Sequence, residues 1–372
     1  MKILITGANG FIGKNLICEL KNRGYKDIYE CDKDTSLEEL DKYTKDCNFV
    51  YHIAGVNRPK DNDEYMEGNF GFTSTLLNKL KENNNKCPIL LTSSIQAELD
   101  NPYGISKKAG EDLLFQYSED ENVKVYVYRL PNVFGKWCKP NYNSVIATFC
   151  YNIANNMDIT INNVKTKLTL VYIDDVINEF INCINIDENI SSKNKSFYYI
   201  PITYDKTLGE IVDLINTFKE STKNYIISNM NDEFCKKLYS TYLSYLPRDQ
   251  FIYNAKMNID ERGSFTDLFK SLDRGQESLN ISKPGITKGN HWHHTKNEKF
   301  VVVSGEALIQ LRNINEKEII EYYVSGNKME IVDIPVGYTH NIKNIGTTDL
   351  VTVMWCNEIY DINNPDTFYE EV

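Results

Sequence analysis

Residues 2–13 read KILITGANGFIG, an apolar run that ends in three spaced glycines, and this stretch decides the fold of the first half of the chain. Ile3–Thr6 predicts a buried strand, and the pattern after Gly13 predicts an amphipathic helix. Glycines between a strand and a helix let the backbone approach a pyrophosphate, whose charge the exposed N–H groups of the helix stabilise. We therefore predict a dinucleotide-binding turn with these cofactor contacts: Gly7, Asn9, Gly10, Phe11, Ile12 and Gly13.

Further apolar runs follow this turn and alternate with segments that are long enough for crossover helices. They are Ile28–Cys31, Phe49–Ile53, Ile89–Thr92 and Val123–Arg129. This βαβ series predicts an α/β, Rossmann-type doubly wound parallel sheet.

After about Gln250 the helical periodicity gives way to short, closely spaced strand patterns, which predict an antiparallel all-β sandwich or barrel. We expect the boundary at the end of the Tyr-rich stretch before Pro247. The chain then has an α/β domain over residues 1–246 and an all-β domain over residues 247–372.

Composition restricts the partners of the chain. The 372 residues carry a net charge of −11, from 41 Lys and Arg against 52 Asp and Glu, so we expect no nucleic-acid partner. No apolar run approaches the roughly 20 residues that span a bilayer, and the N-terminus has no signal-peptide pattern. The nine cysteines are scattered, which is typical of reduced thiols. We expect a cytoplasmic protein without a membrane partner.

Asp32 and Lys33 end the predicted second strand, 19 positions beyond Gly13. At this place an acidic residue binds the 2′-hydroxyl of NAD, and a basic residue binds the 2′-phosphate of NADP. The two neighbours favour opposite cofactors, so these residues alone leave the choice open.

A Ser-Tyr-Lys set follows the glycine turn in the chain. Tyr103 and Lys107 lie one turn apart on a predicted helix, and Ser93 and Ser94 end a predicted strand before it. The ammonium can lower the pKa of the phenol and let it act as an acid or base, while a serine hydroxyl polarises the substrate oxygen. A packing tyrosine beside an exposed lysine is the alternative for the pair alone.

These motifs resemble those of the extended short-chain dehydrogenase/reductases that act on nucleotide sugars. The resemblance rests on Gly7, Gly10, Gly13, residues 52–55 (HIAG), Asn69, Ser93, Ser94, Tyr103, Lys107, residues 129–135 (RLPNVFG) and residues 172–176 (YIDDV). It implies that Ser94, in preference to Ser93, is catalytic. Tyr103 and Lys107 would be catalytic and also contact the cofactor. Ala54 and Gly55 would line the cofactor, and Asn132 would lie where cofactor meets sugar.

The chain departs from that family in two places. The serine precedes the tyrosine by only nine positions, so the loop that covers the sugar is trimmed. Where sugar 4,6-dehydratases have an Asp-Glu pair after a threonine, Thr92 is followed by two serines. Without a carboxylate to eliminate water, dehydration is disfavoured, and ketone reduction or 4-epimerisation remains.

The second domain contains a candidate metal site. Residues two apart on a strand face the same way, so His291 and His293 point inward together, and His294 points outward. With Glu298 and His340, these two histidines form a set of three imidazoles and one carboxylate that suits zinc, and equally iron, nickel or manganese. Core histidines without a metal are the alternative reading.

The spacing G-x5-HxH-x4-E-x6-G, followed by P-x-G-x2-H-x3-N, resembles both motifs of the cupins, apart from a longer gap before Pro335. The resemblance implies a jelly-roll barrel. A metal there can be structural, or can act as a Lewis acid when a proton leaves the carbon next to a ketone. Cupin sugar epimerases often work without a metal, so the metal set is a departure from them. Tyr338 and Lys288 are candidate proton carriers.

The two domains together resemble the bifunctional enzymes of capsular polysaccharide synthesis that make UDP-2-acetamido-2,6-dideoxy-L-talose in the UDP-N-acetyl-L-fucosamine pathway. This implies a UDP-activated 4-keto-6-deoxy-N-acetylhexosamine substrate. Its C3 would be epimerised in the cupin domain first, because the 4-keto group acidifies the C3–H, and NADPH would then reduce the C4 ketone.

The same resemblance implies zinc at the four ligands and a homodimer. The preference of these enzymes for NADPH favours Lys33 as the residue that binds the 2′-phosphate, whereas Asp32 leaves NAD open as the alternative cofactor. The basic stretch Lys136–Lys139 would receive the UDP diphosphate or form a solvated loop.

Two other classes of function fit parts of the sequence. One is a monofunctional nucleotide-sugar 4-reductase or 4-epimerase whose cupin serves for binding or dimerisation. The other is a non-catalytic sensing scaffold, which the intact Ser94, Tyr103 and Lys107 set disfavours.

Overall fold

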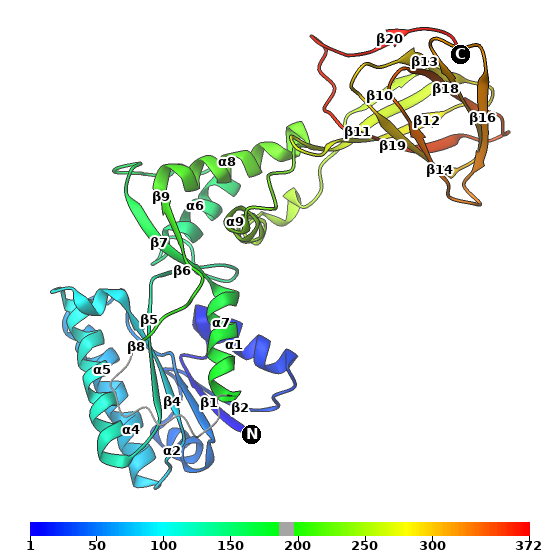
Figure 1. Cartoon of the computed structure of the whole chain (residues 1–372). Helices are drawn as coiled ribbons and strands as arrows, with labels where there is room; N and C mark the ends of the chain where they lie inside the picture. Colours follow the sequence, from blue (N-terminus) through cyan, green and yellow to red (C-terminus); the bar gives the residue numbers. More distant parts are fainter. Residues whose placement is uncertain (186–196) are drawn as a thin grey trace. The chain divides into compact units, whose positions relative to one another are not determined.

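The computed structural model describes residues 1–185 and 197–372, which divide into two compact units (Figure 1). The N-terminal unit comprises Met1–Ile215 and Lys236–Pro247, and the C-terminal unit comprises Asn216–Cys235 and Arg248–Val372. In the described part of the chain, no helix combines the length and the apolar content that crossing a bilayer requires.

A six-stranded parallel sheet forms the centre of the N-terminal unit, in the order β2-β1-β3-β4-β5-β8. Its strands are β1 (Lys2–Thr6), β2 (Asp27–Cys31), β3 (Phe49–His52), β4 (Ile89–Ser94), β5 (Val125–Leu130) and β8 (Phe197–Tyr198). The predicted parallel, Rossmann-type sheet is confirmed. The chain passes from β1 to β2 on one side and returns to β3 on the other, so the order reverses at β1. Ligands of such sheets bind at this reversal, at the carboxyl ends of the strands.

Helices cover both faces of this sheet because its strands are apolar on both sides. Ile3 and Ile5 pack with α1 (Phe11–Asn22) and α7 (Ile173–Asn182). Leu4 faces the other side, which is covered by α2 (Leu37–Asp46), α4 (Phe72–Glu82) and α5 (Pro102–Glu121). Figure 1 shows these two groups of helices on opposite faces of the sheet.

The remaining elements between Asp63 and Gln250 lie outside the predicted strands, and most of them belong to the N-terminal unit. They are α3 (Asp63–Met66), the π-helix η1 (Glu67–Gly71), η2 (Ile95–Glu98), β6 (Asn132–Phe134), α6 (Val145–Ala154), β7 (Lys167–Tyr172), η3 (Cys183–Asn185), β9 (Tyr204–Thr207), α8 (Leu208–Asn224), α9 (Glu233–Leu243) and η4 (Arg248–Gln250), of which α8, α9 and η4 reach or lie in the segments of the C-terminal unit. The strands β6, β7 and β9 form a separate small sheet.

From Met257 onward the C-terminal unit is formed by two antiparallel sheets, as the prediction of an all-β region required. One sheet has the order β10-β11-β12-β19-β14-β17, and the other has the order β16-β15-β18-β13-β20. The strands are β10 (Met257–Asp260), β11 (Gly263–Ser271), β12 (Gly275–Ser282), β13 (Thr287–Trp292), β14 (Glu298–Ser304), β15 (Glu306–Asn313), β16 (Ile319–Ser325), β17 (Ile331–Ile334), β18 (Tyr338–Asn344), β19 (Leu350–Cys356) and β20 (Phe368–Tyr369).

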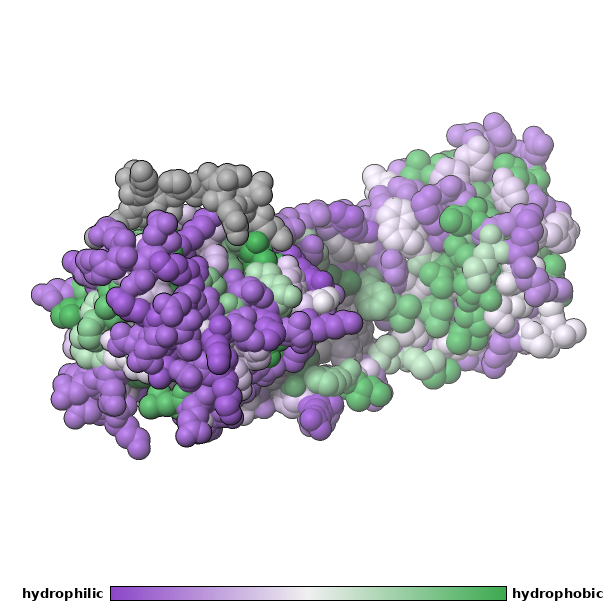
Figure 2. Space-filling view, turned by 90° about the horizontal axis from the view of Figure 1, so that it is seen from below, coloured by the Kyte–Doolittle hydropathy of each residue, from purple (hydrophilic) through white to green (hydrophobic). Residues whose placement is uncertain are grey.

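The core of this unit joins the two sheets. Phe300 and Val302 of one sheet pack in the same buried cluster as Ile309 and Ile342 of the other. On its visible face, Figure 2 shows an apolar area on the C-terminal unit, while hydrophilic residues dominate the visible face of the N-terminal unit. Exposed apolar side chains of the C-terminal unit include Met257, Ile259, Phe269 and Leu272.

Close packing at the start of α1 explains the third glycine of the turn. A Cβ added at Gly13 would lie 2.2 Å from the carbonyl oxygen of Gly7 and 2.8 Å from that of Ala8. Because both neighbours are backbone atoms of the turn, the helix could accept a side chain there only by moving away from the turn.

We predict that Gly13→Ala lowers the free energy of unfolding by about 1–3 kcal/mol, as overpacking of a close contact does. Gly71→Ala is the matched control, because its added Cβ would lie 3.9 Å from the nearest atom, the carbonyl oxygen of Met66. Urea unfolding followed by circular dichroism measures both variants. Equal stability of the two would contradict the packing argument.

Candidate functional site

The glycine turn lies where the strand order reverses, directly after β1. Gly7 has φ +71°, and a Cβ there would lie 2.8 Å from the backbone nitrogen of Ala54. Gly10 precedes α1 and has no side chain with which to cap it, so the first N–H groups of the helix are left for a ligand. The turn therefore has the geometry that the prediction of a dinucleotide-binding turn requires, and it packs closely against the predicted cofactor residue Ala54.

The structure brings Asp32 to the glycine turn. One carboxylate oxygen of Asp32 accepts a hydrogen bond from the backbone N–H of Asn9 at 2.8 Å, and the other accepts from the N–H of Lys33 at 2.8 Å. Lys33 has an exposed side chain at the same strand end. The two residues predicted to decide between NAD and NADP thus both lie beside the glycine turn.

Gly55 links the cofactor edge to the Ser-Tyr-Lys set. A Cβ at Gly55 would lie 2.8 Å from both Lys107 Nζ and Asn69 Oδ1. The Asn69 amide accepts from the N–H of Val56 at 3.0 Å and donates to the Ser106 hydroxyl at 2.9 Å, so it fixes this segment to α5. Asn69 lies in the π-helix η1, and such irregular turns often occur at functional sites.

His52 packs between two threonines. Its ring nitrogens lie 2.7 Å from Thr6 Oγ1 and 2.8 Å from Thr73 Oγ1. Burial, reinforced by the charge of Lys107, lowers the pKa of His52 to about 3, so the imidazole is neutral. These two contacts connect the end of β3 to β1 and to α4.

Tyr103 and Lys107 lie on one face of α5, with Lys107 Nζ 5.9 Å from the centre of the Tyr103 ring. The ammonium donates to the carbonyl oxygen of Thr92 at 3.2 Å. Burial lowers the pKa of Lys107 to about 8, and the charge of Glu111 opposes this change.

The expected lowering of the phenol pKa is not found in this structure. Burial raises the pKa of Tyr103 to about 12, although a hydrogen bond with Ser94 opposes the rise. Tyr103 therefore holds its proton at neutral pH, which is the state that a proton donor requires.

The two candidate serines have different surroundings. Ser94 hydrogen-bonds the Tyr103 phenol and also accepts from the N–H of Gln96 at 3.1 Å. Ser93 donates instead to the buried carboxylate of Glu111, which forms an ion pair with Arg129 at 2.7 Å. Ser94 thus interacts with the phenol, whereas Ser93 belongs to a buried ionic network.

Two other predicted positions, Asn132 and Lys136, are exposed or partly exposed. The exposed Asn132 side chain donates to the carbonyl oxygen of Thr169 at 3.2 Å. In the basic stretch, Lys136 forms an ion pair with Asp174 at 2.6 Å. The charge of Lys136 is therefore already partly compensated.

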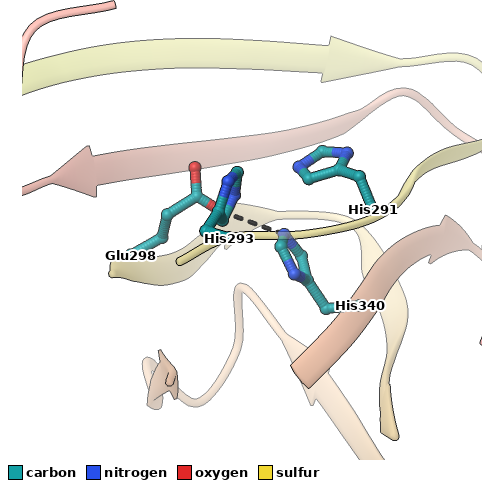
Figure 3. A group of neighbouring side chains, drawn as sticks. All are labelled: His291, His293, Glu298 and His340. Carbon is teal, nitrogen blue, oxygen red and sulfur yellow. Dashed lines mark ion pairs between the residues drawn. The ribbon is translucent and has the colours of Figure 1, made fainter. Parts of the chain in front are cut away.

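The four predicted metal ligands converge in the C-terminal unit (Figure 3). His291 lies on β13 with His293 directly after that strand, His340 lies on β18, and Glu298 begins β14 of the other sheet. Their ligand atoms all lie within 4.8 Å of one another. By contrast, His294 is exposed and packs against Trp292 and Phe368.

Three of these ligand atoms are buried without a hydrogen-bond partner among the described residues: His293 Nε2, Glu298 Oε2 and His340 Nε2. Glu298 Oε2 lies 3.0 Å from His340 Nε2 and 3.6 Å from His293 Nε2. Buried polar atoms are rarely left unpaired, and these aim at a common point. The donor set and its orphaned atoms fit a divalent cation such as zinc.

The ionisation of the cluster also suits a cation, because ligands must be deprotonated to bind one. Burial, with smaller contributions from nearby charges, lowers the pKa of His291 to about 4. Burial disfavours ionised Glu298, but its contacts with His293 and His340 outweigh this and hold its pKa well below the usual range.

A pocket of about 450 Å³ opens onto this cluster, and Lys288 is among its lining residues. A β-bulge at Asn290, which has φ +60°, shifts the register between Gly289 and His291. Lys288 and His291 are therefore on the same face, although they are three residues apart. Tyr338, the other candidate proton carrier, packs against the hydrophobic core.

Sequence reasoning missed several residues of this pocket. Lys296 and Tyr360 also line it, and Lys296 donates to the carbonyl oxygen of Pro365 at 2.8 Å. The segment after β19 has no strand periodicity that would have pointed to Tyr360.

Two family models match the chain. The NAD dependent epimerase/dehydratase family matches residues 3–192, and the polysaccharide biosynthesis C-terminal domain matches residues 258–368. A relative from Pseudomonas aeruginosa, named UDP-2-acetamido-2,6-beta-L-arabino-hexul-4-ose reductase, is 43% identical and covers 99% of this chain and 98% of its own.

Solved structures are similar over the whole chain and over part of it. The capsular polysaccharide assembling protein CapF from Staphylococcus aureus is 54% identical, with a TM-score of 0.93 over 100% of both chains. A UDP-glucuronic acid 4-epimerase from Bacillus cereus is 18% identical, with a TM-score of 0.56 over 68% of this chain and 100% of its own. The second likeness is one of fold alone.

We predict that the protein binds one zinc ion per chain and that His293→Ala weakens this binding by at least tenfold, because it removes one of four ligands. His294→Ala is the matched control, since this exposed neighbour lies outside the ligand set. Zinc competition with a chromophoric chelator measures both affinities. Equal losses in the two variants would contradict the assignment of ligands.

Proposed function

Because the chain belongs to the NAD dependent epimerase/dehydratase family, we propose that it is a nucleotide-sugar reductase and epimerase of capsular polysaccharide synthesis. Its substrate would be a UDP-2-acetamido-2,6-dideoxy-4-hexulose. The C-terminal unit, as a jelly-roll cupin, would epimerise C3, and the N-terminal unit would reduce C4 to give UDP-2-acetamido-2,6-dideoxy-L-talose. The names of the Pseudomonas reductase and of CapF support the substrate class and the pathway.

The observation that carries the reductase is a protonated phenol beside a buried ammonium at the cofactor edge. The nicotinamide cofactor would supply the hydride to C4. Tyr103 would donate its proton to the C4 oxygen, and Ser94, which hydrogen-bonds the phenol, would orient that oxygen. Lys107 would stabilise the phenolate that remains, because its ammonium lies 5.9 Å from the ring centre.

NADPH is the proposed cofactor, and zinc the proposed metal. The exposed Lys33 at the end of β2 supports NADPH, while Asp32 is already engaged by the backbone of Asn9. The orphaned ligand atoms of the cluster support a divalent ion. Exposed Met257, Ile259 and Phe269 on β10 and β11 support a homodimer through the C-terminal unit.

In the epimerase site, the 4-keto group of the sugar makes the C3 proton acidic. A metal held by His291, His293, Glu298 and His340 would supply positive charge near the keto oxygen. Lys288 would carry the C3 proton, because it lines the same pocket and burial lowers its pKa. Its amine is positioned by hydrogen bonds to Asn280 Oδ1 at 2.8 Å and to the Ile281 carbonyl oxygen at 2.9 Å.

Dehydration remains disfavoured for this chain. The buried carboxylate closest in sequence to the active tyrosine and lysine is Glu111, and it is held by Arg129 and Ser93. A carboxylate engaged in that network is not free to remove a proton from C5. This supports reduction over 4,6-elimination.

We predict that Tyr103→Phe abolishes NADPH oxidation by the keto sugar but leaves solvent exchange at C3 intact, because the variant lacks only the proton donor of the reductase. His291→Ala should do the reverse and lose C3 exchange. Absorbance of NADPH follows reduction, and mass spectrometry in deuterated water follows exchange. Loss of both activities in either variant would point to one coupled site and would overturn the two-site proposal.

We predict that kcat/KM for reduction falls as the pH rises through about 8, the pKa of Lys107. Above that pH the buried lysine loses its charge and no longer stabilises the phenolate, whereas Tyr103 keeps its proton until about pH 12. Initial rates of NADPH oxidation across this range test the assignment. A profile that stays flat well above pH 8 would exclude a charged Lys107 from the step.

A further inference from the structure

The C-terminal residues Pro365–Glu370, here named the clasp, lie against the segments that carry the metal ligands. The Asp366 carboxylate accepts hydrogen bonds from the backbone N–H groups of His294 at 3.0 Å, Thr295 at 2.9 Å and Lys296 at 3.0 Å. It also accepts from the Thr295 hydroxyl at 3.0 Å. These residues form the turn that joins His293 to Glu298, so one carboxylate fixes the connection between two ligands.

The same residue orients an imidazole. His293 Nδ1 lies 2.5 Å from the backbone carbonyl oxygen of Asp366. A carbonyl can only accept, so Nδ1 carries the proton and donates it. In the neutral imidazole the other nitrogen, Nε2, is then the one without a proton, and it faces Glu298 without a hydrogen bond of its own within the described residues.

The clasp also contacts the strands of the other two ligands. In β20, Tyr369 pairs with His291 on β13, and the Glu370 N–H donates to the Asn290 carbonyl oxygen at 3.0 Å. The Thr339 hydroxyl, one residue before His340, donates to the Glu370 carbonyl oxygen. All four ligand-bearing segments thus meet one stretch at the end of the chain.

We propose that Asp366 is a positioning residue of the metal site, through which the clasp sets the separation of His293 and Glu298 and the tautomer of His293. This inference rests on the proposed metal site. Without the Asp366 carboxylate, the N–H groups of residues 294–296 lose their common acceptor. They can then bind water, and the turn is no longer held in one conformation. Partners of metal ligands commonly change metal affinity by about 10–100-fold when they are removed.

The test uses the full chain and zinc. Asp366→Ala removes the acceptor, and Asp366→Asn keeps the shape and one acceptor oxygen. Asp361→Asn is the matched control, because Asp361 is exposed and accepts from the N–H of Asn363 within the same terminal segment. Competition with a chromophoric chelator gives the zinc affinity, and the visible spectrum of the Co²⁺-substituted protein reports the geometry of the ligands.

We expect a loss of zinc affinity of about 10–100-fold for Asp366→Ala, a smaller loss for Asp366→Asn, an altered Co²⁺ spectrum in both, and no change for the control. Unchanged affinity and spectrum in Asp366→Ala would overturn the proposal. If that variant loses the near-ultraviolet circular dichroism of the folded protein, Asp366→Asn decides, and its unchanged affinity and spectrum would overturn the proposal equally.

Failure of the clasp and failure of the epimerase give different results. If the wild-type protein binds zinc but shows no C3 exchange, the proposed epimerase activity is contradicted, and the zinc-affinity test of Asp366 still applies. If Asp366→Ala keeps full C3 exchange and unaltered zinc binding, only the proposed positioning role of Asp366 is contradicted.

Discussion

The mutual approach of three imidazoles and one carboxylate is the constraint around which the C-terminal unit is arranged. Glu298 and His340 come from different sheets, and their atoms meet at 3.0 Å inside the protein. Burying such atoms without partners is costly, and a shared cation would remove that cost. The bulge at Asn290 and the contacts of the terminal segment both act on the strand that carries His291.

The N-terminal unit meets a different constraint, which is the burial of a phenol and an amine side by side. Burial raises the pKa of Tyr103 and lowers that of Lys107, so burial favours the uncharged form of both side chains. A protonated phenol is a proton donor for a reduction. The glycine turn, Ala54 and Gly55 connect this pair to the strand end at which a dinucleotide would bind.

Much of this arrangement could be predicted from the sequence because it follows local periodicity. The spacing of His291 and His293 predicted both on one face, and the apolar runs located β1 to β5 of the large parallel sheet but not its edge strand β8. Other features depend on tertiary structure. A one-residue bulge brings Lys288 to the metal face, burial reverses the expected pKa change of Tyr103, and Asp366 acts from a segment with no regular pattern. Tyr338, the other candidate proton carrier, is partly buried against the hydrophobic core, a contact that its sequence position does not reveal.

The proposal that two chemistries act in sequence on one sugar is tested most directly by nuclear magnetic resonance. A UDP-4-keto-6-deoxy-N-acetylhexosamine is incubated with the protein in deuterated water, first without NADPH and then with it. Deuterium is expected at C3 before the cofactor is added, followed by NADPH-dependent formation of one reduced 6-deoxy sugar that carries this deuterium. Reduction without prior exchange at C3 would contradict it and would leave the C-terminal unit a binding or structural module.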